Sequence, residues 1–461
     1  MKNAIILAAG KGTRMHSDSP KVLHEVCGEP MVGMIIDTLK KAGAERLVTV
    51  VGYEHERVEA ALGDKCEYAL QEPQLGSGHA AMQAVQLKDD NGITLVVNGD
   101  VPCIKAETYR ALYEALDDAD MAVLTVKLTD PAAYGRIIRD EKGNIARIVE
   151  FRDCNEEEKA VNEINTGIYA FKNPDLFAGL KELKNDNNQQ EYYITDLVEI
   201  FIGKGKTVKA VVAADPEEVQ GVNDNVELAR ANKYLRMRIN EEWMRKGVTM
   251  IDPERTYIGA KVTFGRDVVL HPNIYLYGET HIGNDTTITP GSYLVNAVIG
   301  DHCLINASEI TDSEVKNSCQ VGPYAHLRMH TLVEDKNRIG NFVEFKNTHF
   351  GVDSRCAHLT YLGDSEVGSK VNIGCGVITV NYDGANKYHT VIKDGAFIGS
   401  NANLIAPVTI GENAVVAAGS TATKDVPDGD MAISRVRQEN KEGFGRYYLE
   451  RTRAKKMSGK K

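Results

Sequence analysis

The sequence predicts an α/β protein whose first part, residues 1–224, is a mostly parallel, mixed sheet covered by helices. A helical linker is expected over residues 225–250 and a parallel β-helix over residues 251–461. Three observations predict this organisation: alternating strand and helix patterns before residue 225, one amphipathic stretch after it, and a six-residue repeat beyond Thr256. The length of 461 residues agrees, because a single core rarely organises more than about 300 residues.

Before residue 225, short apolar runs rich in β-branched residues alternate with helical patterns. The expected strands are Ala4–Leu7, Leu47–Gly52, Thr94–Val97, Met121–Leu128 and Ile164–Phe171, and the expected helices include Met31–Ala42 and Gly78–Leu87. Such alternation predicts a mostly parallel sheet with both faces covered. Ligands of these sheets bind beyond the carboxyl ends of the strands, where the loops Ala8–Pro20 and Asn98–Asp100 are expected.

The residues from Asn225 to Lys246 have the pattern of one continuous helix. Apolar residues recur on one face at spacings of seven, four and four, at Leu228, Leu235, Ile239 and Trp243. No glycine occurs before Gly247. This stretch is expected to connect the two parts of the chain.

After Thr256, an apolar residue followed by glycine recurs many times. The apolar members of these pairs are Ile258, Phe264, Ile282, Ile299, Val321, Ile339, Phe350, Val367, Ile373, Ile398 and Ile410. Several separations are multiples of six, which is the signature of a β-helix with three hexapeptides in each coil. The interval from Ile373 to Ile398 breaks the count and contains the polar segment Asn381–Asn386. A functional loop is expected there, since loops that interrupt a solenoid often carry function.

The composition is that of a globular protein and excludes several other classes. Apolar residues make up 43% and charged residues 26%, unlike disordered or collagen-like chains. The net charge of −11 argues against a general nucleic-acid binder. No apolar run approaches the roughly 20 residues of a membrane helix, and Ala4–Gly10 is too short for a signal peptide. We therefore expect a cytoplasmic protein with no membrane or nucleic-acid partner.

The eight cysteines are scattered, with no C-x-x-C pair. A zinc site or a disulfide framework requires tighter grouping, so free thiols in a reducing compartment are expected. The basic end of the chain, Arg451–Lys461, is expected to be a frayed, solvated tail.

A glycine-rich loop follows the first expected strand, with the sequence L-A-A-G-K-G-T-R-M over Leu7–Met15 and Pro-Lys at residues 20–21. Its glycines let backbone N–H groups approach phosphate oxygens, while Arg14 and Lys21 supply positive charge. Met15 stands where a dinucleotide-binding loop has its third glycine, and the Gly-Lys-Ser/Thr ending of a P-loop is missing. The pattern predicts a phosphate site of another kind. Asp100, at a strand end, is well placed to hold Mg²⁺ over the same crevice.

These motifs resemble those of the sugar-nucleotide pyrophosphorylase family. Its further motifs follow in order: Gln71 with Leu75–Ala80, Gly99–Asp100, Tyr134–Arg136, Ile148–Glu150, Ile164–Gly167 and Gly221–Asn223. From Ala4 to about Gly443 the chain resembles the bacterial bifunctional enzymes that make UDP-N-acetylglucosamine. The resemblance implies a Rossmann-like nucleotidyltransferase domain followed by a left-handed β-helix. The first domain would join UTP to N-acetylglucosamine 1-phosphate, and the second would make that phosphate by acetylating glucosamine 1-phosphate with acetyl-CoA.

Residue by residue, the resemblance implies a site for UTP and UDP-N-acetylglucosamine in the first domain. The implied contacts are Leu7, Ala8, Ala9 and Gly10 with the nucleotide, Lys21 with its phosphates, Gln71, Gly76 and Ser77 with the base, Gly135, Glu150 and Asn165 with the sugar, and Asn98 and Gly99 beside the metal ligands Asp100 and Asn223. Asn98 stands where some members carry an aromatic residue, which changes little if the contact is through the backbone. Because the sugar phosphate is already a nucleophile, catalysis needs positioning and charge stabilisation by Mg²⁺, Lys21 and Arg14.

The second half carries the sequence strings of the resembled acetyltransferase at residues 341–346, 358–364 and 373–384. They imply His358 as the general base, with Glu344 as a group that orients or polarises it, and a neutral imidazole suits the deprotonation of an amine. The remaining implied contacts are Arg328, Lys346, Tyr361 and Asn372 with glucosamine 1-phosphate, and Cys375, Asn381, Tyr382, Ser400, Ala418 and Arg435 with acetyl-CoA. Met329 and Cys375 depart from the proline and alanine of other members, but neither removes a required polar group.

Two alternatives remain at this point. The chain could be a single-activity sugar-nucleotide pyrophosphorylase whose β-helix serves regulation or assembly, or a non-catalytic scaffold. The single-activity pyrophosphorylase is disfavoured by the presence of Arg328, Lys346 and His358. The non-catalytic scaffold is disfavoured by the glycine-rich loop with Lys21 and Asp100. The resemblance also implies a homotrimer packed along the β-helix, with small molecules as the other partners.

Overall fold

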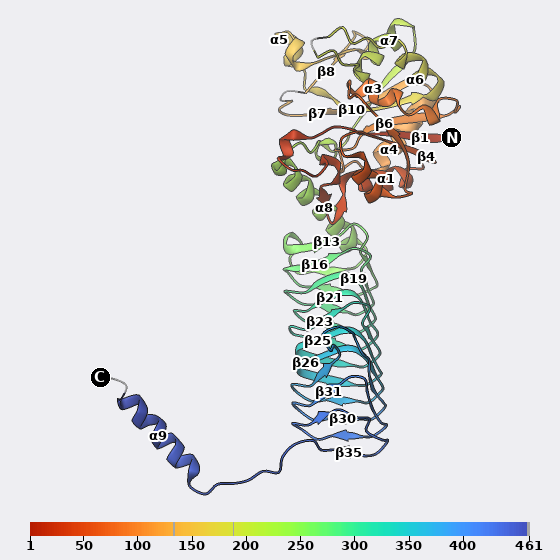
Figure 1. The fold of residues 1–461 in the computed structure, drawn as a ribbon. Coiled ribbons are helices and arrows are strands. Elements are labelled where there is room, and N and C mark those ends of the chain that lie inside the picture. The colour runs from red at the N-terminus through yellow and green to blue at the C-terminus, as the bar shows by residue number, and fades with distance from the viewer. Residues whose placement is uncertain (132–133, 188, 459–461) are drawn as a thin grey trace. The chain divides into compact units, whose positions relative to one another are not determined.

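The computed structural model describes residues 1–131, 134–187 and 189–458 (Figure 1). The chain divides into two compact units. The first unit comprises Met1–Lys246 with Tyr257–Lys261, and the second comprises Gly247–Thr256 with the residues from Val262 onward.

The first unit is built on a mixed sheet with the strand order β11-β7-β10-β6-β1-β4-β5. The strands are β1 (Lys2–Ala8), β4 (Arg46–Val51), β5 (Glu67–Leu70), β6 (Ile93–Asn98), β7 (Met121–Lys127), β10 (Glu163–Lys172) and β11 (Val208–Val212), with β8 (Arg136–Arg139) and β9 (Ile145–Val149) branching from β10. β6, β1, β4 and β5 run parallel, as do β7 and β11, while β10 is antiparallel to both of its neighbours. The predicted fold class and all five predicted strands are confirmed.

Helices cover both faces of this sheet. Alternate residues of β1 enter opposite cores, Ala4 and Ile6 with the helices α1 (Met31–Lys41), α2 (His55–Leu62) and α4 (Ala106–Glu114), and Ile5 with α3 (Ser77–Met82), α6 (Asn173–Leu180) and α7 (Leu197–Gly203). A short helix, α5 (Glu156–Lys159), begins with a capping box between Asn155 and Glu158. Because β1 is buried on both faces, its carboxyl end is held rigidly.

The predicted helix Gly78–Leu87 is wrong in its second half. α3 ends at Met82, and a separate 3₁₀ turn follows at Val85–Leu87. The side-chain amide of Gln83 donates to the His79 carbonyl at 2.9 Å, which is the acceptor that the Gln83 backbone N–H would use in a continued helix. The side chain thus ends the helix locally.

The predicted helix after residue 224 is confirmed as α8 (Asn225–Arg245). Asp224 caps it, because its carboxylate accepts from the N–H groups of Val226 and Glu227. Leu228, Leu235 and Ile239 pack into one small core of the first unit. The cap lies directly after Asn223, so the start of α8 fixes a residue of the predicted metal site.

The second unit is a parallel β-helix, in which each short strand pairs with strands of the neighbouring coils. Its described strands run from β12 (Thr249–Met250) to β35 (Met431–Ala432). Regular coils contain three hexapeptides, as between the paired residues Val269 and Thr287, whereas the coil between Leu304 and its partner Gln320 is shorter. Ile282, Ile299, Ile373 and Ile398 are at most 3% exposed, so these apolar residues of the repeat point inward as predicted.

One coil of the β-helix is longer than the others. Ile373 pairs directly with Ile398, and the extra residues between them form the predicted polar loop. The end of the chain also differs from the expectation, because α9 (Phe444–Ser458) is a helix with no buried residue where a frayed tail is predicted. Residues 459–461 of that predicted tail lie outside the described residues. Across the described ranges, no helix is both long and apolar enough to cross a bilayer.

Candidate active sites

The first site forms where β1 and β6 end side by side. The Gly99 N–H donates to the Leu7 carbonyl at 2.9 Å, and a Cβ at position 99 would lie only 2.9 Å from the same oxygen. Gly12 adopts a φ of +64°, and a Cβ there would collide with the Lys21 side chain. Both glycines are therefore required for the loops to approach each other closely. Gly10 has open space around its Cα, in keeping with a backbone that can receive a ligand.

Lys21 lies at the centre of this site. Its ammonium group forms an ion pair with the Asp100 carboxylate and lies 3.4 Å from Asn223 Oδ1. Arg14 donates to the same Asn223 oxygen at 2.7 Å. Asn223 is held by its own N–H, which donates to Glu227 Oε2 at 2.7 Å. The structure thus brings together four predicted residues from three distant segments.

The oxygens of Asp100 and Asn223 fit a hard divalent cation. Both face the same cationic group, the Lys21 ammonium, so they converge on one point. One carboxylate and one amide oxygen are a small ligand set, which suits a cation whose remaining ligands are water and phosphate. Within the described ranges, no group of three or more His, Cys, Asp or Glu side chains could form a larger metal site.

The residues predicted to contact the base of the nucleotide lie together after β5. Gln71 is 5% exposed, and its side-chain amide donates to the Gly76 carbonyl at 3.0 Å. Gly76 has a φ of +97°, and a Cβ there would lie 2.7 Å from the Tyr192 carbonyl. The Ser77 hydroxyl accepts from the Ile194 N–H at 3.2 Å. The Gln71–Ser77 segment is therefore fixed against residues 192–194.

The predicted sugar contacts also converge. The Asn165 N–H donates to the Gly135 carbonyl at 2.9 Å, and a Cβ on Gly135 would lie 3.3 Å from Glu150 Oε1. Glu150 borders a cavity of about 520 Å³, which is also lined by Phe151, Arg152, Asp153, Asn187, Gln189 and Tyr193. Partial desolvation and then the charge of Asp153 raise the pKa of Glu150. Asn98 approaches this region through its amide, whose nitrogen would lie only 2.7 Å from a Cβ on Gly167.

In the β-helix, three cations gather near one point. Arg328 of β23 (His326–Arg328) and Lys346 of β25 (Arg338–Phe350) are direct partners on neighbouring coils. Lys387, from the loop of the long coil, is close enough that the charges of Lys346 and then Arg328 lower its pKa. Sequence reasoning missed Lys387, because no motif marks its position. A group of three cations suits a phosphate.

The acids beside these cations hold them in place. Lys346 is 7% exposed and forms an ion pair with Asp364 at 3.3 Å. Arg328 donates from two nitrogens to Glu344 Oε1, at 2.9 and 2.7 Å. Burial raises the pKa of Asp364, but hydrogen bonds from Asn347, Asn381 and Lys346 outweigh it, so the net pKa is lowered. Asp364 is a further residue to which the sequence assigned no role.

His358, the predicted general base, and three of the predicted acetyl-CoA contacts form one column along the β-helix. His358 of β26 (Arg355–Val367) pairs with Asn341 on one neighbouring coil, and the register continues on the other side through Cys375, Ser400 and Ala418. Close packing needs the glycines between them, since a Cβ on Gly374 would lie 2.6 Å from the Ser400 nitrogen. Arg435 lies beside this column, with its side chain near Gly419. Cys375 is the exposed member of eight free cysteines.

Other predicted contacts are placed differently. Glu344 binds Arg328 and makes no hydrogen bond to His358, whose side chain has no partner among the described residues. Asn372 belongs to another column, between Arg355 and Phe397. The Tyr361 hydroxyl lies against Gly363. Tyr382 is 56% exposed and donates to the Gly384 carbonyl, so it stands on the loop of the long coil.

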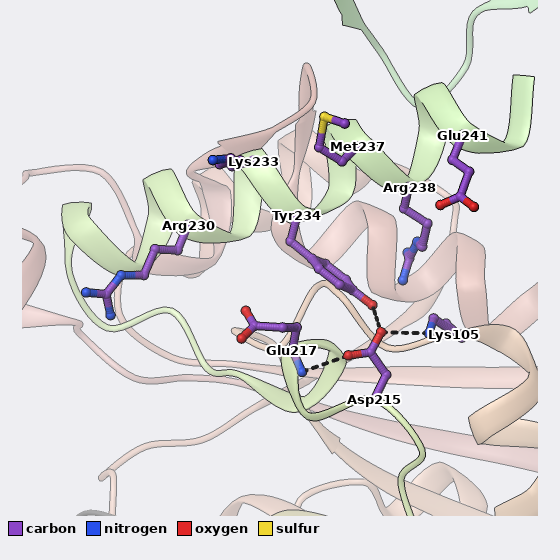
Figure 2. A pocket seen from close by; sticks show the side chains of 9 residues that line it. All are labelled: Lys105, Asp215, Glu217, Arg230, Lys233, Tyr234, Met237, Arg238 and Glu241. Atoms are coloured by element: carbon purple, nitrogen blue, oxygen red, sulfur yellow. Dashed lines mark hydrogen bonds and ion pairs between the residues drawn. The ribbon is translucent and has the colours of Figure 1, made fainter. Parts of the chain in front are cut away.

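A groove of about 470 Å³ along α8 contains none of the predicted site residues (Figure 2). Its charged groups bind one another: the Asp215 carboxylate accepts from Tyr234 at 2.6 Å and from Lys105 at 3.0 Å, as the dashed lines show. The Glu217 N–H donates to the second Asp215 oxygen at 3.1 Å. These hydrogen bonds therefore hold α8 against the segment that precedes it.

Comparison with known proteins assigns both units. Residues 4–164 match the MobA-like NTP transferase domain, and residues 389–424 match the bacterial transferase hexapeptide repeat. A protein of Geobacillus sp. (strain WCH70) named "Bifunctional protein GlmU" is 51% identical over 458 residues, covering 99% of both chains. Proteins of the same name from Exiguobacterium sibiricum and Listeria monocytogenes serotype 4b (strain F2365) are 51% and 46% identical, each covering 96% of this chain and 99% and 98% of their own lengths.

Proposed function

The chain belongs to the family of bifunctional GlmU proteins, and from this premise we propose which residues perform each of its two reactions. The enzyme acetylates glucosamine 1-phosphate and transfers a uridylyl group from UTP to N-acetylglucosamine 1-phosphate. One observation carries the assignment of residues: two separate clusters of charged groups, one in each unit, each beside a glycine-shaped backbone.

In uridylyl transfer, a phosphate oxygen of N-acetylglucosamine 1-phosphate attacks the α-phosphorus of UTP. The bond between the α- and β-phosphates breaks, and pyrophosphate leaves. Lys21 and Arg14 stabilise the charge on the phosphates, while the backbone from Leu7 to Gly10 binds the nucleotide. These groups act by positioning, so no residue needs to take a proton.

Asp100 and Asn223 would hold Mg²⁺ through the two oxygens that converge on Lys21. The cation would neutralise phosphate charge and orient the leaving pyrophosphate. Gln71, Gly76 and Ser77 bind the base. Gly135, Glu150 and Asn165 bind the sugar, beside the cavity at Glu150. Asn98 and Gly99 complete the edge of this site.

In acetyl transfer, the amine of glucosamine 1-phosphate attacks the thioester carbonyl of acetyl-CoA. His358 takes a proton from that amine, the carbon–sulfur bond breaks, and coenzyme A leaves as the thiolate, which then takes up a proton to become the free thiol. Arg328, Lys346 and Lys387 bind the sugar phosphate, while Tyr361 and Asn372 bind the sugar. Since Glu344 binds Arg328, we assign it to the orientation of that guanidinium and not of His358.

Acetyl-CoA is proposed to lie along the column of Cys375, Ser400 and Ala418. The column begins beside His358, which supports a thioester held next to the base. Asn381 and Tyr382 flank it from the loop of the long coil, and Arg435 binds the phosphates of the coenzyme.

We further propose a homotrimer packed along the β-helix. Tyr324, Phe342 and Leu359 follow one another on a corner of successive coils, each 61% exposed, and such a column of large apolar groups is typical of an interface. Free, scattered cysteines support a cytoplasmic location.

The test measures both reactions on the purified protein. Thiol release from acetyl-CoA should depend on glucosamine 1-phosphate, and UDP-N-acetylglucosamine should form from UTP only with Mg²⁺ present. A single-activity pyrophosphorylase would release no thiol, and a scaffold would catalyse neither reaction, so either result contradicts the assignment.

A further inference from the structure

Lys387 lies on the loop of the long coil, close to two of the predicted acetyl-CoA contacts. Its backbone forms an antiparallel bridge with Tyr382. The N–H of the next residue, Tyr388, donates to the Asn381 carbonyl at 2.9 Å. The turn between these residues is fixed by Asp383, whose carboxylate accepts from two backbone N–H groups of the loop at 2.8 and 2.7 Å. The backbone therefore holds Lys387 beside Asn381 and Tyr382.

Two ammonium groups meet near this loop, but only one of them has a carboxylate partner. Lys346 forms an ion pair with Asp364 at 3.3 Å, and the carboxylate favours the charged form of that ammonium. Lys387 is exposed and forms no ion pair with an acid in the part of the chain that the structure describes. The adjacent Lys346 ammonium is the main cause of a lowered pKa of Lys387, and the charge of Arg328 adds to it. An amine beside other cations is more often unprotonated, and only the unprotonated amine is a nucleophile.

We propose that Lys387 is a site of self-acetylation, at which the protein modifies its own phosphate-binding loop with acetyl-CoA when no sugar phosphate is bound. The inference rests on the proposed function, which places acetyl-CoA beside Asn381 and Tyr382. Lys387 Nζ attacks the thioester carbonyl carbon, a carbon–nitrogen bond forms, and the carbon–sulfur bond breaks. Coenzyme A leaves as the thiolate, and the proton lost from the nitrogen converts it to the free thiol.

The modification changes the proposed phosphate site. The amide product carries no charge, so the site keeps two of its three cations, Arg328 and Lys346. A bound sugar phosphate opposes the reaction, because its negative charge favours the protonated form of the Lys387 amine. Acetylation therefore proceeds when acetyl-CoA is present and glucosamine 1-phosphate is lacking, and it weakens the binding of that substrate.

The test incubates the purified full-length chain with acetyl-CoA alone and follows the acetylation of individual lysines by mass spectrometry. Lys393 is the matched control, since it is a nearby exposed lysine whose ammonium forms an ion pair with Asp428 at 3.1 Å. We expect Lys387 to be acetylated about ten-fold faster than Lys393, because its lowered pKa leaves more of the amine unprotonated. N-Acetylglucosamine 1-phosphate, which carries the same phosphate but no free amine, should slow the reaction at Lys387 and leave that at Lys393 unchanged.

The consequence for binding is measured on the acetylated protein. Its KM for glucosamine 1-phosphate should be raised about ten-fold, as expected when one charged contact to the phosphate is lost. Lys387→Arg should remove the mass increase at this position while Lys393 is acetylated as before. An unchanged KM after complete acetylation of Lys387 would overturn the inference.

Equal acetylation of Lys387 and Lys393 would also overturn it, as would a rate at Lys387 that N-acetylglucosamine 1-phosphate does not change. Thiol release with glucosamine 1-phosphate, measured on the same preparation, tests the proposed function separately. If thiol is released with that substrate while Lys387 stays unmodified, only self-acetylation is wrong. If neither reaction occurs, the proposed function fails as well.

Discussion

Asn381 donates its side-chain amide to Asp364 Oδ2 at 2.5 Å, and this bond joins the loop of the long coil to β26 of the neighbouring coil. Asp364 also binds Lys346, so a single carboxylate connects the proposed acetyl-CoA side with the proposed phosphate side. Both of these partners of Asp364 are buried. A change at this position should therefore affect both stability and acetyl transfer.

We expect Asp364→Asn to destabilise the β-helix by about 3 kcal/mol, because it leaves the buried Lys346 ammonium without its counter-charge. Acetyl transfer should fall, while uridylyl transfer should stay near normal. The matched control is Asp353→Asn, an exposed aspartate of the same unit. Thermal unfolding and the two activity assays check this. Equal melting temperatures for the two variants would show that the ion pair contributes nothing.

The same residue predicts a pH dependence. The pKa of Asp364 is lowered in the folded protein, so its contribution to stability is present above the unfolded-state value of about 3.9 and is lost as the pH falls through the folded value. The melting temperature of the wild type should therefore approach that of Asp364→Asn between about pH 5 and pH 3. A constant difference over that range would contradict the lowered pKa.

Asp100→Ala should abolish Mg²⁺-dependent formation of UDP-N-acetylglucosamine and leave thiol release from acetyl-CoA near normal. The two proposed sites lie in different units, and distant independent sites rarely couple strongly. Asp18→Ala, an exposed carboxylate before Lys21, serves as control. Comparable loss of both activities in a folded variant would remove the basis for the assignment.

His358→Ala should lower kcat for acetylation by about 10²–10⁴-fold, the usual contribution of a general base. KM for acetyl-CoA should change little, and uridylyl transfer from supplied N-acetylglucosamine 1-phosphate should continue at the wild-type rate. His302→Ala tests another exposed histidine of the β-helix. Near-normal acetylation by His358→Ala would mean that another group takes the proton.

Sedimentation should give three times the chain mass at concentrations where acetylation is measured. Phe342→Glu, which puts a charge into the exposed apolar column beside Tyr324, should shift the mass toward the single chain. A wild-type monomer with full acetyltransferase activity would rule the trimer out.

The buried strands of the first unit were predictable because a parallel strand covered on both faces is a continuous apolar run, as in Thr94–Val97. The direction of β10 was not, since an antiparallel strand buried in the same sheet has the same composition. The hairpin β8–β9 escaped prediction for a similar reason: its residues are partly exposed and lack a clear alternation.

In the β-helix, the repeat indicated the architecture but not the length of each coil. Shorter coils, such as the one between Leu304 and Gln320, depart from three hexapeptides but keep their inward apolar positions, since Ile305 and its partner Val321 are both buried. The contacts within the proposed acetyltransferase site could likewise be predicted only in part. The sequence marked Lys346 and Asn381 only through resemblance, and the carboxylate that joins them is visible only once neighbouring coils are in register.

The pairing of Ile373 with Ile398 has a consequence for how such a protein can change over time. The inserted loop leaves the stack at one coil and returns to it with the core register intact, so the coils on either side keep their pairing. Loop residues that make no contact with the coils can therefore change without altering the architecture, whereas Asn381, which is buried and bonded to Asp364, is tied to it.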